Sequence, residues 1–164
     1  KKTFELFKTY PICHYSGRLG PKLKVGDLQA PEGFYSVTKD KLNPNSRFHL
    51  SFNLGFPNAL ERSLGRTGSF LMIHGGCFST GCYAMTNELM EEIYYLVEAS
   101  LNSNNESFSV HSFPFKMSNH RIDTATSHTW YSFWSNLKLG YDWFESKSIP
   151  PEVDHDDGVY TFKN

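Results

Sequence analysis

The sequence has few cysteines, almost no net charge and no long apolar run, and each shortage excludes a class of protein. Three cysteines in 164 residues are too few for a disulfide-built scaffold. A formal net charge of −1 leaves no basic surface of the kind that binds nucleic acid, so we expect no nucleic-acid partner. The longest apolar runs fall well short of the roughly 20 residues that a spanning helix needs, and we expect no membrane span.

Aromatic residues, by contrast, are abundant. They make up 16% of the chain, and fourteen Phe, nine Tyr and three Trp supply much of the volume of a core. A chain of this length can bury a real core, and no linker interrupts it, so we expect a single domain over residues 1–164. The chain opens on residues typical of a strand rather than of a signal peptide, so we expect an earlier strand or a leader to precede it.

Hydrophobic periodicity predicts strands first and helices later. Alternating or continuous apolar residues predict strands over 4–7, 10–12, 34–37, 48–52, 69–73, 108–115 and 158–162. Apolar residues at three- and four-residue steps predict a helix from Thr86 or Asn87 to residue 101, and a second over 129–144 that is broken at Gly140. Residues 57–68 are expected to be a long charged connection. The order predicts a mainly β fold with peripheral helices rather than an alternating βαβ sheet.

One short stretch, Ile73–Asn87, concentrates reactive side chains among glycines. It contains His74, Cys77 and Cys82, and three interpretations compete: a metal site, a disulfide, and a thiol nucleophile with its base. Zinc usually takes four ligands, often in closely spaced pairs, and no fourth ligand lies nearby, so we expect no metal. A buried histidine with two inert thiols is a further alternative, against which the glycines argue, since they let the backbone turn sharply or approach a ligand.

The nucleophile interpretation fits the stretch best. Cys82 is expected at a tight turn just before a helix, where the helix N-terminus and an imidazole would lower the thiol pKa. His74, eight residues earlier, would take the proton. Backbone N–H groups around Gly81 and Cys82 would hold the oxyanion of a tetrahedral intermediate.

The stretch also resembles the active-site motif of the L,D-transpeptidases, the YkuD-like domains, in which a histidine–glycine pair precedes a glycine–cysteine pair. The resemblance is greatest to the YafK-like branch, whose motif fits residues 73–86 throughout. Further segments match the same branch, namely residues 10–13, 16–22, 26–35, 56–62, 111–117, 133–145 and 150–160. The resemblance covers nearly the whole chain and implies a YkuD-like β-sandwich or barrel.

The resemblance further implies an exported, periplasmic or secreted, cysteine enzyme that acts on peptidoglycan without a cofactor. Cys82 would be the nucleophile and His74 the base, with the backbone around Thr80 and Gly81 orienting the histidine and forming the oxyanion hole. The YafK-like branch is associated with hydrolysis of the bond between diaminopimelate and the lysine of wall-linked lipoprotein. Thr80 stands where the family commonly has histidine, and Ala84 where it has arginine, which favours water as the acceptor.

An alternative within the family is an L,D-carboxypeptidase or transpeptidase that acts on tetrapeptide stems, in a secreted antibacterial effector. The expected partners are therefore peptidoglycan stem peptides and wall-linked lipoprotein, bound by a monomer.

Several other side chains are candidates for substrate binding. Arg18 and Arg62 could hold carboxylates by charge-assisted bonds, whereas Lys22 is expected to be an ordinary surface charge. His49 and Asn53 fall on one face of an expected strand and could line the cleft. Ser79 could bind substrate or cap the turn.

The two remaining cysteines leave two alternatives open. Cys13 ends an expected strand and Cys77 follows the strand that carries His74, so the two could form a disulfide in an oxidising compartment. Two buried free thiols are an equal alternative, because sequence does not determine connectivity.

Overall fold

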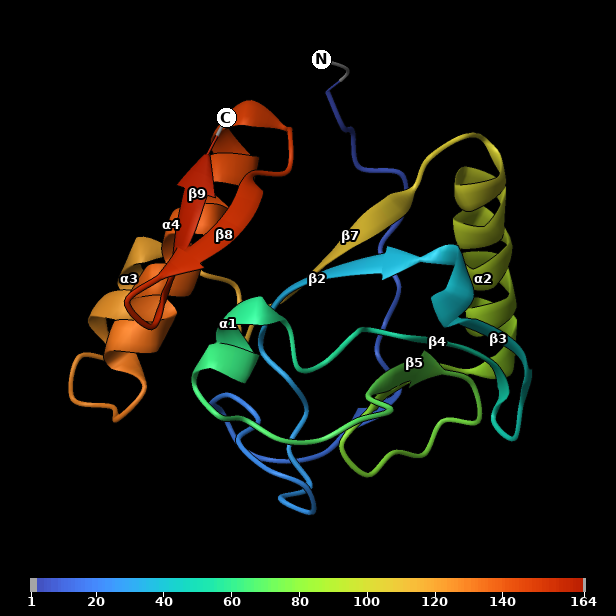
Figure 1. The fold of residues 1–164 in the computed structure, drawn as a ribbon, viewed down its shortest axis with the longest axis horizontal. Coiled ribbons are helices and arrows are strands. Elements are labelled where there is room, and N and C mark those ends of the chain that lie inside the picture. The colour runs from blue at the N-terminus through green and yellow to red at the C-terminus, as the bar shows by residue number, and fades with distance from the viewer. Residues whose placement is uncertain (1–2, 164) are drawn as a thin grey trace.

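The computed structural model describes residues 3–163, which form three β-sheets and four α-helices (Figure 1). The strands are β1 (His14–Tyr15), β2 (Gly33–Thr38), β3 (Leu42–Ser46), β4 (His49–Asn53), β5 (Met72–His74), β6 (Tyr83–Ala84), β7 (Ser107–Ser112), β8 (Glu152–Asp156) and β9 (Val159–Lys163). The helices are α1 (Ala59–Ser63), α2 (Asn87–Asn102), α3 (Asn119–Asp123) and α4 (Tyr131–Lys147), with a 3-10 turn at Lys39–Lys41. The predicted β fold with helices around it is confirmed.

The largest sheet has five strands in the order β1-β6-β5-β4-β3. All neighbours in it are antiparallel except β5 and β6, which run parallel with His74 opposite Ala84. The other sheets are two-stranded and antiparallel: β2 pairs with β7, and β8 forms a hairpin with β9. The parallel pair matters most for the site, because it sets the two segments of the reactive stretch side by side.

Two aromatic-rich cores lie on opposite sides of β2. Successive side chains of a strand point to opposite faces, and here Phe34 joins one core while Tyr35 and Val37 join the other. The first core packs β2 and β7 against the large sheet and α2, and the second packs them against α4 and the β8–β9 hairpin (Figure 1). The abundance of Phe, Tyr and Trp is thus used to fill both cores.

The predicted helix after the reactive stretch is confirmed as α2. Its N-cap is Thr86, whose hydroxyl accepts a hydrogen bond from the Leu89 amide at 3.4 Å. The buried side of α2, which includes Met90 and Tyr94, packs on the first core beside β4. The apolar repeat seen in the sequence is therefore the face that covers the sheet.

The predicted break at Gly140 is wrong, because α4 runs without interruption from Tyr131 to Lys147. A Cβ at this position would lie 2.5 Å from ring atoms of both Phe34 and Phe162. Glycine is present here so that two aromatic rings can approach the helix backbone, at a cost in helix propensity of about 1 kcal/mol relative to alanine.

Two further expectations about secondary structure are corrected. Residues 4–7 and 10–12 form no strand, since no neighbouring strand in the described chain pairs with them, and Leu6 and Phe7 lie exposed. The expected connection over residues 57–68 contains the short helix α1. Its start is marked by a capping box, in which Asn58 and Glu61 bond each other's backbone amides, and this pattern is visible in the sequence.

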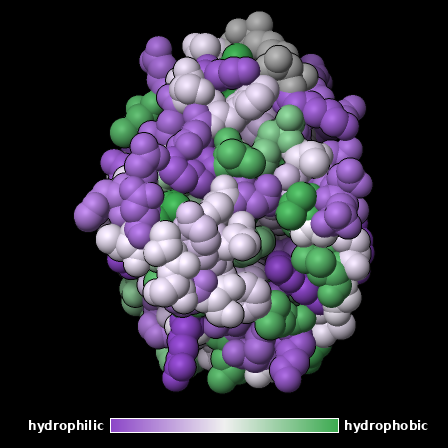
Figure 2. All heavy atoms as spheres, turned by 90° about the vertical axis from the view of Figure 1, so that its left-hand side faces the viewer, coloured by the Kyte–Doolittle hydropathy of each residue, from purple (hydrophilic) through white to green (hydrophobic). Residues whose placement is uncertain are grey.

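The helices of residues 3–163 lack the combination of length and apolarity that a membrane span requires. No helix in this range is both long enough and apolar enough to cross a bilayer. On the face formed by the C-terminal elements, apolar side chains occur in small groups among polar ones (Figure 2).

A half-buried histidine beside the second core predicts an acid-sensitive fold. His111 on β7 packs at 4.8 Å from the Phe34 ring, and burial lowers its pKa from 6.5 to about 4. Between these pH values the unfolded chain binds a proton that the folded chain does not, so the free energy of unfolding falls as the pH falls. We expect a loss of about 3 kcal/mol from this group between pH 7 and pH 4.

Urea denaturation of the wild type and of His111→Phe at both pH values measures this loss. The variant keeps an aromatic ring but cannot titrate, and should lose about 3 kcal/mol less than the wild type. Equal losses in the two proteins would assign the acid sensitivity to other groups.

Candidate active site

The segments that carry His74 and Cys82 lie side by side because β5 and β6 are parallel neighbours. Cys82 directly precedes β6 and lies beside Met72, whose amide donates a hydrogen bond to the Cys82 sulfur at 3.3 Å. His74 is two residues further along β5, so its side chain is on the same face as that of Met72. The eight-residue spacing in sequence therefore becomes a diagonal pair on one sheet face.

The His74 imidazole is fixed in one orientation and one tautomer. It is only 4% exposed, and its ring packs at 4.8 Å from the Phe48 ring at the tip of the β3–β4 hairpin. Its Nδ1 lies 2.6 Å from the Gly75 carbonyl oxygen. A carbonyl can only accept, so Nδ1 carries a proton, and in the neutral ring Nε2 holds the lone pair that a base requires.

The Cys82 thiol is half-buried, and its hydrogen-bond partners are backbone groups. Its S–H donates to the Phe70 carbonyl at 3.6 Å, and no hydrogen bond within residues 3–163 joins it to His74. Burial raises the pKa of the thiol, and the smaller opposing effects of the Met72 amide and the Lys22 ammonium do not reverse this. Burial in this conformation therefore favours the protonated thiol over the thiolate.

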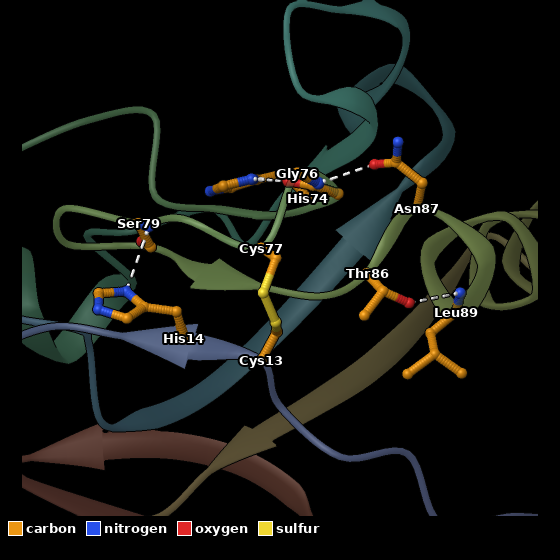
Figure 3. The surroundings of a disulfide bond; sticks show 10 residues. Cys13, His14, His74, Gly76, Cys77, Ser79, Thr86, Asn87 and Leu89 are labelled. Atoms are coloured by element: carbon orange, nitrogen blue, oxygen red, sulfur yellow. Dashed lines mark hydrogen bonds between the residues drawn. A yellow bond between two sulfur atoms is a disulfide. The ribbon is translucent and has the colours of Figure 1, made fainter.

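The expectation that a helix N-terminus activates Cys82 is wrong. The helix begins only at Asn87, and strand β6 lies between it and the cysteine. The Asn87 side chain instead accepts a hydrogen bond from the Gly76 amide at 2.8 Å, which ties the helix start to the loop after His74 (Figure 3).

Three contacts from β1 and its flanks hold the loop between the histidine and the cysteine. Cys13 and Cys77 form a disulfide, with Cα atoms 5.3 Å apart, and the free cysteine of the described chain is Cys82. Next to it, His14 Nδ1 accepts from the Ser79 amide at 3.2 Å (Figure 3). The Ser16 hydroxyl accepts from the Gly81 amide at 2.6 Å. An N-terminal segment thus holds the loop that leads into Cys82.

The amides expected to hold an oxyanion already have acceptors. The Gly81 amide donates to Ser16, and the Cys82 amide donates to the Ser79 hydroxyl at 2.8 Å. The same Ser79 hydroxyl donates to the Cys82 carbonyl at 2.7 Å, so Ser79 closes the turn, while Thr80 is exposed. An oxyanion at this place would have to replace one of the two hydroxyls.

Backbone strain gathers around the cysteine. Leu28, Phe70 and Cys77 adopt left-handed conformations with φ of 56°, 56° and 51°, which are uncommon for residues other than glycine. At Phe70 this turns the carbonyl toward the Cys82 sulfur and leaves the ring 75% exposed. Such strained positions cluster at functional sites because the surrounding structure has to hold them in place.

The other four residues suggested for substrate binding, apart from Ser79, lie in different places. Asn53 pairs with Met72 across the sheet, on the face that carries His74, and its Oδ1 accepts from the Gly55 amide at 2.8 Å. His49 is on the same strand, but its Nε2 is hydrogen-bonded to the Glu91 carboxylate of α2 at 2.7 Å. Arg62 on α1 donates to the Pro57 carbonyl, and Arg18 lines two cavities that do not include Cys82.

A small cavity of about 200 Å³ opens beside the sulfur. Its walls come from the loop after the N-terminal segment and from the segment before β5, which lie side by side in the lower part of Figure 1. Lys22, expected to be a surface charge, lines this cavity and is only 5% exposed. No pattern in the sequence marks this lysine, because its burial depends on a segment some 45 residues later in the chain. The lining residues are Lys22, Val25, Gly26, Leu28, Gly68, Ser69, Phe70, Leu71, Thr80, Gly81 and Cys82.

Two curated proteins are similar to the chain in sequence. No family model matches the chain. The protein named "Putative L,D-transpeptidase YafK" in Escherichia coli strain K12 is 45% identical over 157 residues, or 96% of the chain, and the same values hold for its counterpart in strain O157:H7. The resemblance to YafK-like L,D-transpeptidases is confirmed. The chain spans 64% of the length of these relatives.

The YafK-like domain also has weaker structural neighbours. The helical cell shape determining protein Pgp2 of Campylobacter jejuni matches 87% of the chain and 62% of its own length, with a TM-score of 0.46 and 21% identity. A K307A mutant of that protein gives a TM-score of 0.46 at 20% identity. At this level the likeness does not bear on the reaction of the YafK-like domain.

The acidic, histidine and cysteine side chains of the YafK-like domain are not grouped for metal binding. Among residues 3–163, no cluster of three or more of them is close enough to hold an ion. His74 has its Nδ1 bonded to a carbonyl and Cys77 is in the disulfide, so these two side chains are committed to other partners.

Proposed function

We propose that the YafK-like domain is a cysteine-dependent peptidoglycan amidase that cleaves the bond between diaminopimelate and the lysine of wall-linked lipoprotein. One observation carries the proposal: Cys82 and His74 lie on one face of the β5–β6 pair, and the Nδ1 contact with Gly75 leaves Nε2 of the neutral imidazole available as a base. Identity of 45% to an L,D-transpeptidase relative supports the class of reaction. The cavity beside Cys82 supplies room for substrate atoms.

The first step is acylation of the sulfur. The Cys82 thiol turns away from the Phe70 carbonyl and gives its proton to Nε2 of His74, which converts it to a thiolate. The thiolate attacks the carbonyl carbon of the scissile amide. Collapse of the tetrahedral intermediate forms the thioester and breaks the C–N bond, and His74 returns the proton to the leaving lysine amine.

The second step is hydrolysis of the thioester. His74, neutral again, takes a proton from a water molecule that attacks the thioester carbonyl. The C–S bond breaks, the sulfur leaves as a thiolate that regains the proton from His74, and diaminopimelate leaves with a free carboxylate. During both steps the oxyanion would take the place of a hydroxyl at the Gly81 or Cys82 amide.

The disulfide supports an exported location for this chemistry. Disulfides persist in oxidising compartments such as the periplasm and the exterior of the cell, where peptidoglycan is also found. We propose that the YafK-like domain acts there as a monomer on stem peptides and lipoprotein.

Product analysis tests the proposal. Sacculi that carry covalently bound lipoprotein are incubated with the wild type and with Cys82→Ala, and the soluble protein and digested muropeptides are identified by mass spectrometry. We expect the wild type alone to release lipoprotein with a free lysine amine. Release that is unchanged in Cys82→Ala would contradict the proposal. Loss of a terminal D-residue, or new cross-links without release of lipoprotein, would favour the carboxypeptidase or transpeptidase alternative.

A further inference from the structure

Lys22 is a buried cation at the edge of the reactive centre. It is 5% exposed, although charged side chains are almost never buried unless they are paired, and it lines the same cavity as Cys82. The mechanism described above makes no use of it. The cavity wall also contains the apolar side chains of Val25, Leu28, Phe70 and Leu71, together with backbone and hydroxyl groups.

The ammonium is anchored by two partners and has a third donor to offer. Lys22 Nζ donates to Asp27 Oδ1 and, at 3.1 Å, to the Lys24 carbonyl. An ammonium has three N–H donors, and these two acceptors are its hydrogen-bond partners within residues 3–163. One donor is therefore left on a group that lines the cavity.

The Asp27 carboxylate binds the Lys22 ammonium and also accepts hydrogen bonds from backbone amides. Its two oxygens also accept from the amides of Leu23, Lys24 and Gln29. Burial acts to raise its pKa, but the Lys22 ammonium and these amides outweigh burial and hold the pKa of Asp27 at about 2. The carboxylate thus fixes the turn over residues 22–29 and the lysine together.

The aliphatic part of the Lys22 side chain passes close to the backbone at Gly68. Gly68 has φ of +145°, and a Cβ there would lie 2.9 Å from Cε of Lys22 and 3.1 Å from the Phe56 ring. The Lys22 ammonium lies 5.9 Å from the centre of the same ring. Glycine at position 68 therefore lets the lysine run close to the main chain, so that its charge is held beside the cavity.

We propose that Lys22 binds a carboxylate of the substrate in the cavity beside Cys82. The geometry supports this assignment because a fixed, buried cation with a spare donor, in the wall of the cavity that Cys82 also lines, forms strong charge-assisted bonds with anions. Diaminopimelate and the lysine at the scissile bond both carry carboxylates, so the identity of the ligand rests on the proposed function. The existence of a subsite that binds a carboxylate is independent of the proposed function.

Alkylation of Cys82 tests the subsite without any peptidoglycan. Iodoacetate carries a carboxylate and iodoacetamide is its neutral counterpart of similar size, and both react with the same thiolate. The ratio of their second-order rate constants therefore cancels any change in the thiol pKa. We expect Lys22→Met to lower the ratio of iodoacetate to iodoacetamide rates by about tenfold relative to the wild type.

Lys24→Met is the matched control. It removes the same charge two residues away, from an exposed side chain that does not line this cavity, and its backbone carbonyl remains available to Lys22. We expect a change in the ratio of less than about twofold, since an exposed charge is screened by solvent. An unchanged ratio in a folded Lys22→Met protein, or an equal fall in Lys24→Met, would overturn the proposal.

A measurement on the unaltered protein covers the case in which Lys22→Met does not fold. Acetate should slow alkylation of wild-type Cys82 by iodoacetamide in a saturable manner, whereas acetamide at the same concentration and ionic strength should not. Equal effects of acetate and acetamide would refute the subsite. Failure of lipoprotein release with intact acetate protection would refute only the proposed function.

Discussion

Exchange of His74 for glutamine is expected to lower kcat/KM for lipoprotein release by about a thousandfold. A positioned general base contributes about 10²–10⁴ to the rate, and His74 is required in both steps, first to accept the thiol proton and then to activate water. Its importance is increased here because burial raises the pKa of the Cys82 thiol, so few thiolates exist at neutral pH without a base. Glutamine can fill much of the space beside Phe48 but cannot carry a proton between the two groups.

The control for this variant is His120→Gln. His120 is an exposed residue of α3, far from β5 in the fold, and its replacement should leave the release rate within about twofold of the wild type. Release rates and thermal unfolding are measured for both variants. If His74→Gln folds like the wild type and releases lipoprotein at more than a tenth of the wild-type rate, the imidazole is not the base.

Removal of the disulfide is expected to lower the free energy of unfolding by about 4 kcal/mol. The bond joins residues 64 positions apart, and cross-linking a loop of this length removes about that much conformational free energy from the unfolded chain. The double variant Cys13→Ser, Cys77→Ser should show this loss in urea denaturation. Activity should fall as well, because His14 and Ser16 beside the bond hold the Ser79 and Gly81 amides of the loop that leads into Cys82.

Reduction supplies the internal control for the disulfide. A reducing agent should destabilise the wild type by the same amount and leave the double variant unchanged. Under denaturing, non-reducing conditions the wild type should contain one reactive thiol per chain, that of Cys82. Three reactive thiols would show that the bond does not form in solution.

Local patterns predicted those features that depend on neighbours in sequence. The apolar repeat after Thr86 predicts α2 and its cap correctly, because an amphipathic helix needs only one face to bury and a side chain to satisfy its first amides. The strand signals at residues 34–37 and 48–52 correspond to β2 and β4. By contrast, residues 4–7 have the composition of a strand but no partner, and strands exist only as pairs.

The residues of the candidate site also differ in how far the sequence alone predicts them. His74 and Cys82 stand out in the sequence because glycines surround them. Their placement on one sheet face, however, depends on the parallel pairing of β5 with β6. Lys22 gives no signal at all, since its burial comes from Asp27, Phe56 and Gly68 in three separate segments.

The sequence by itself predicted the class of this protein, its candidate cysteine and histidine, and its main helices, because motif spacing and side-chain periodicity are properties of contiguous residues. Only the tertiary structure decided that the thiol rests against backbone groups, that two expected oxyanion donors are occupied, and that a buried lysine lines the same cavity as the sulfur. Each of these depends on contacts between segments distant in the chain, which form only when the sheets and cores pack together.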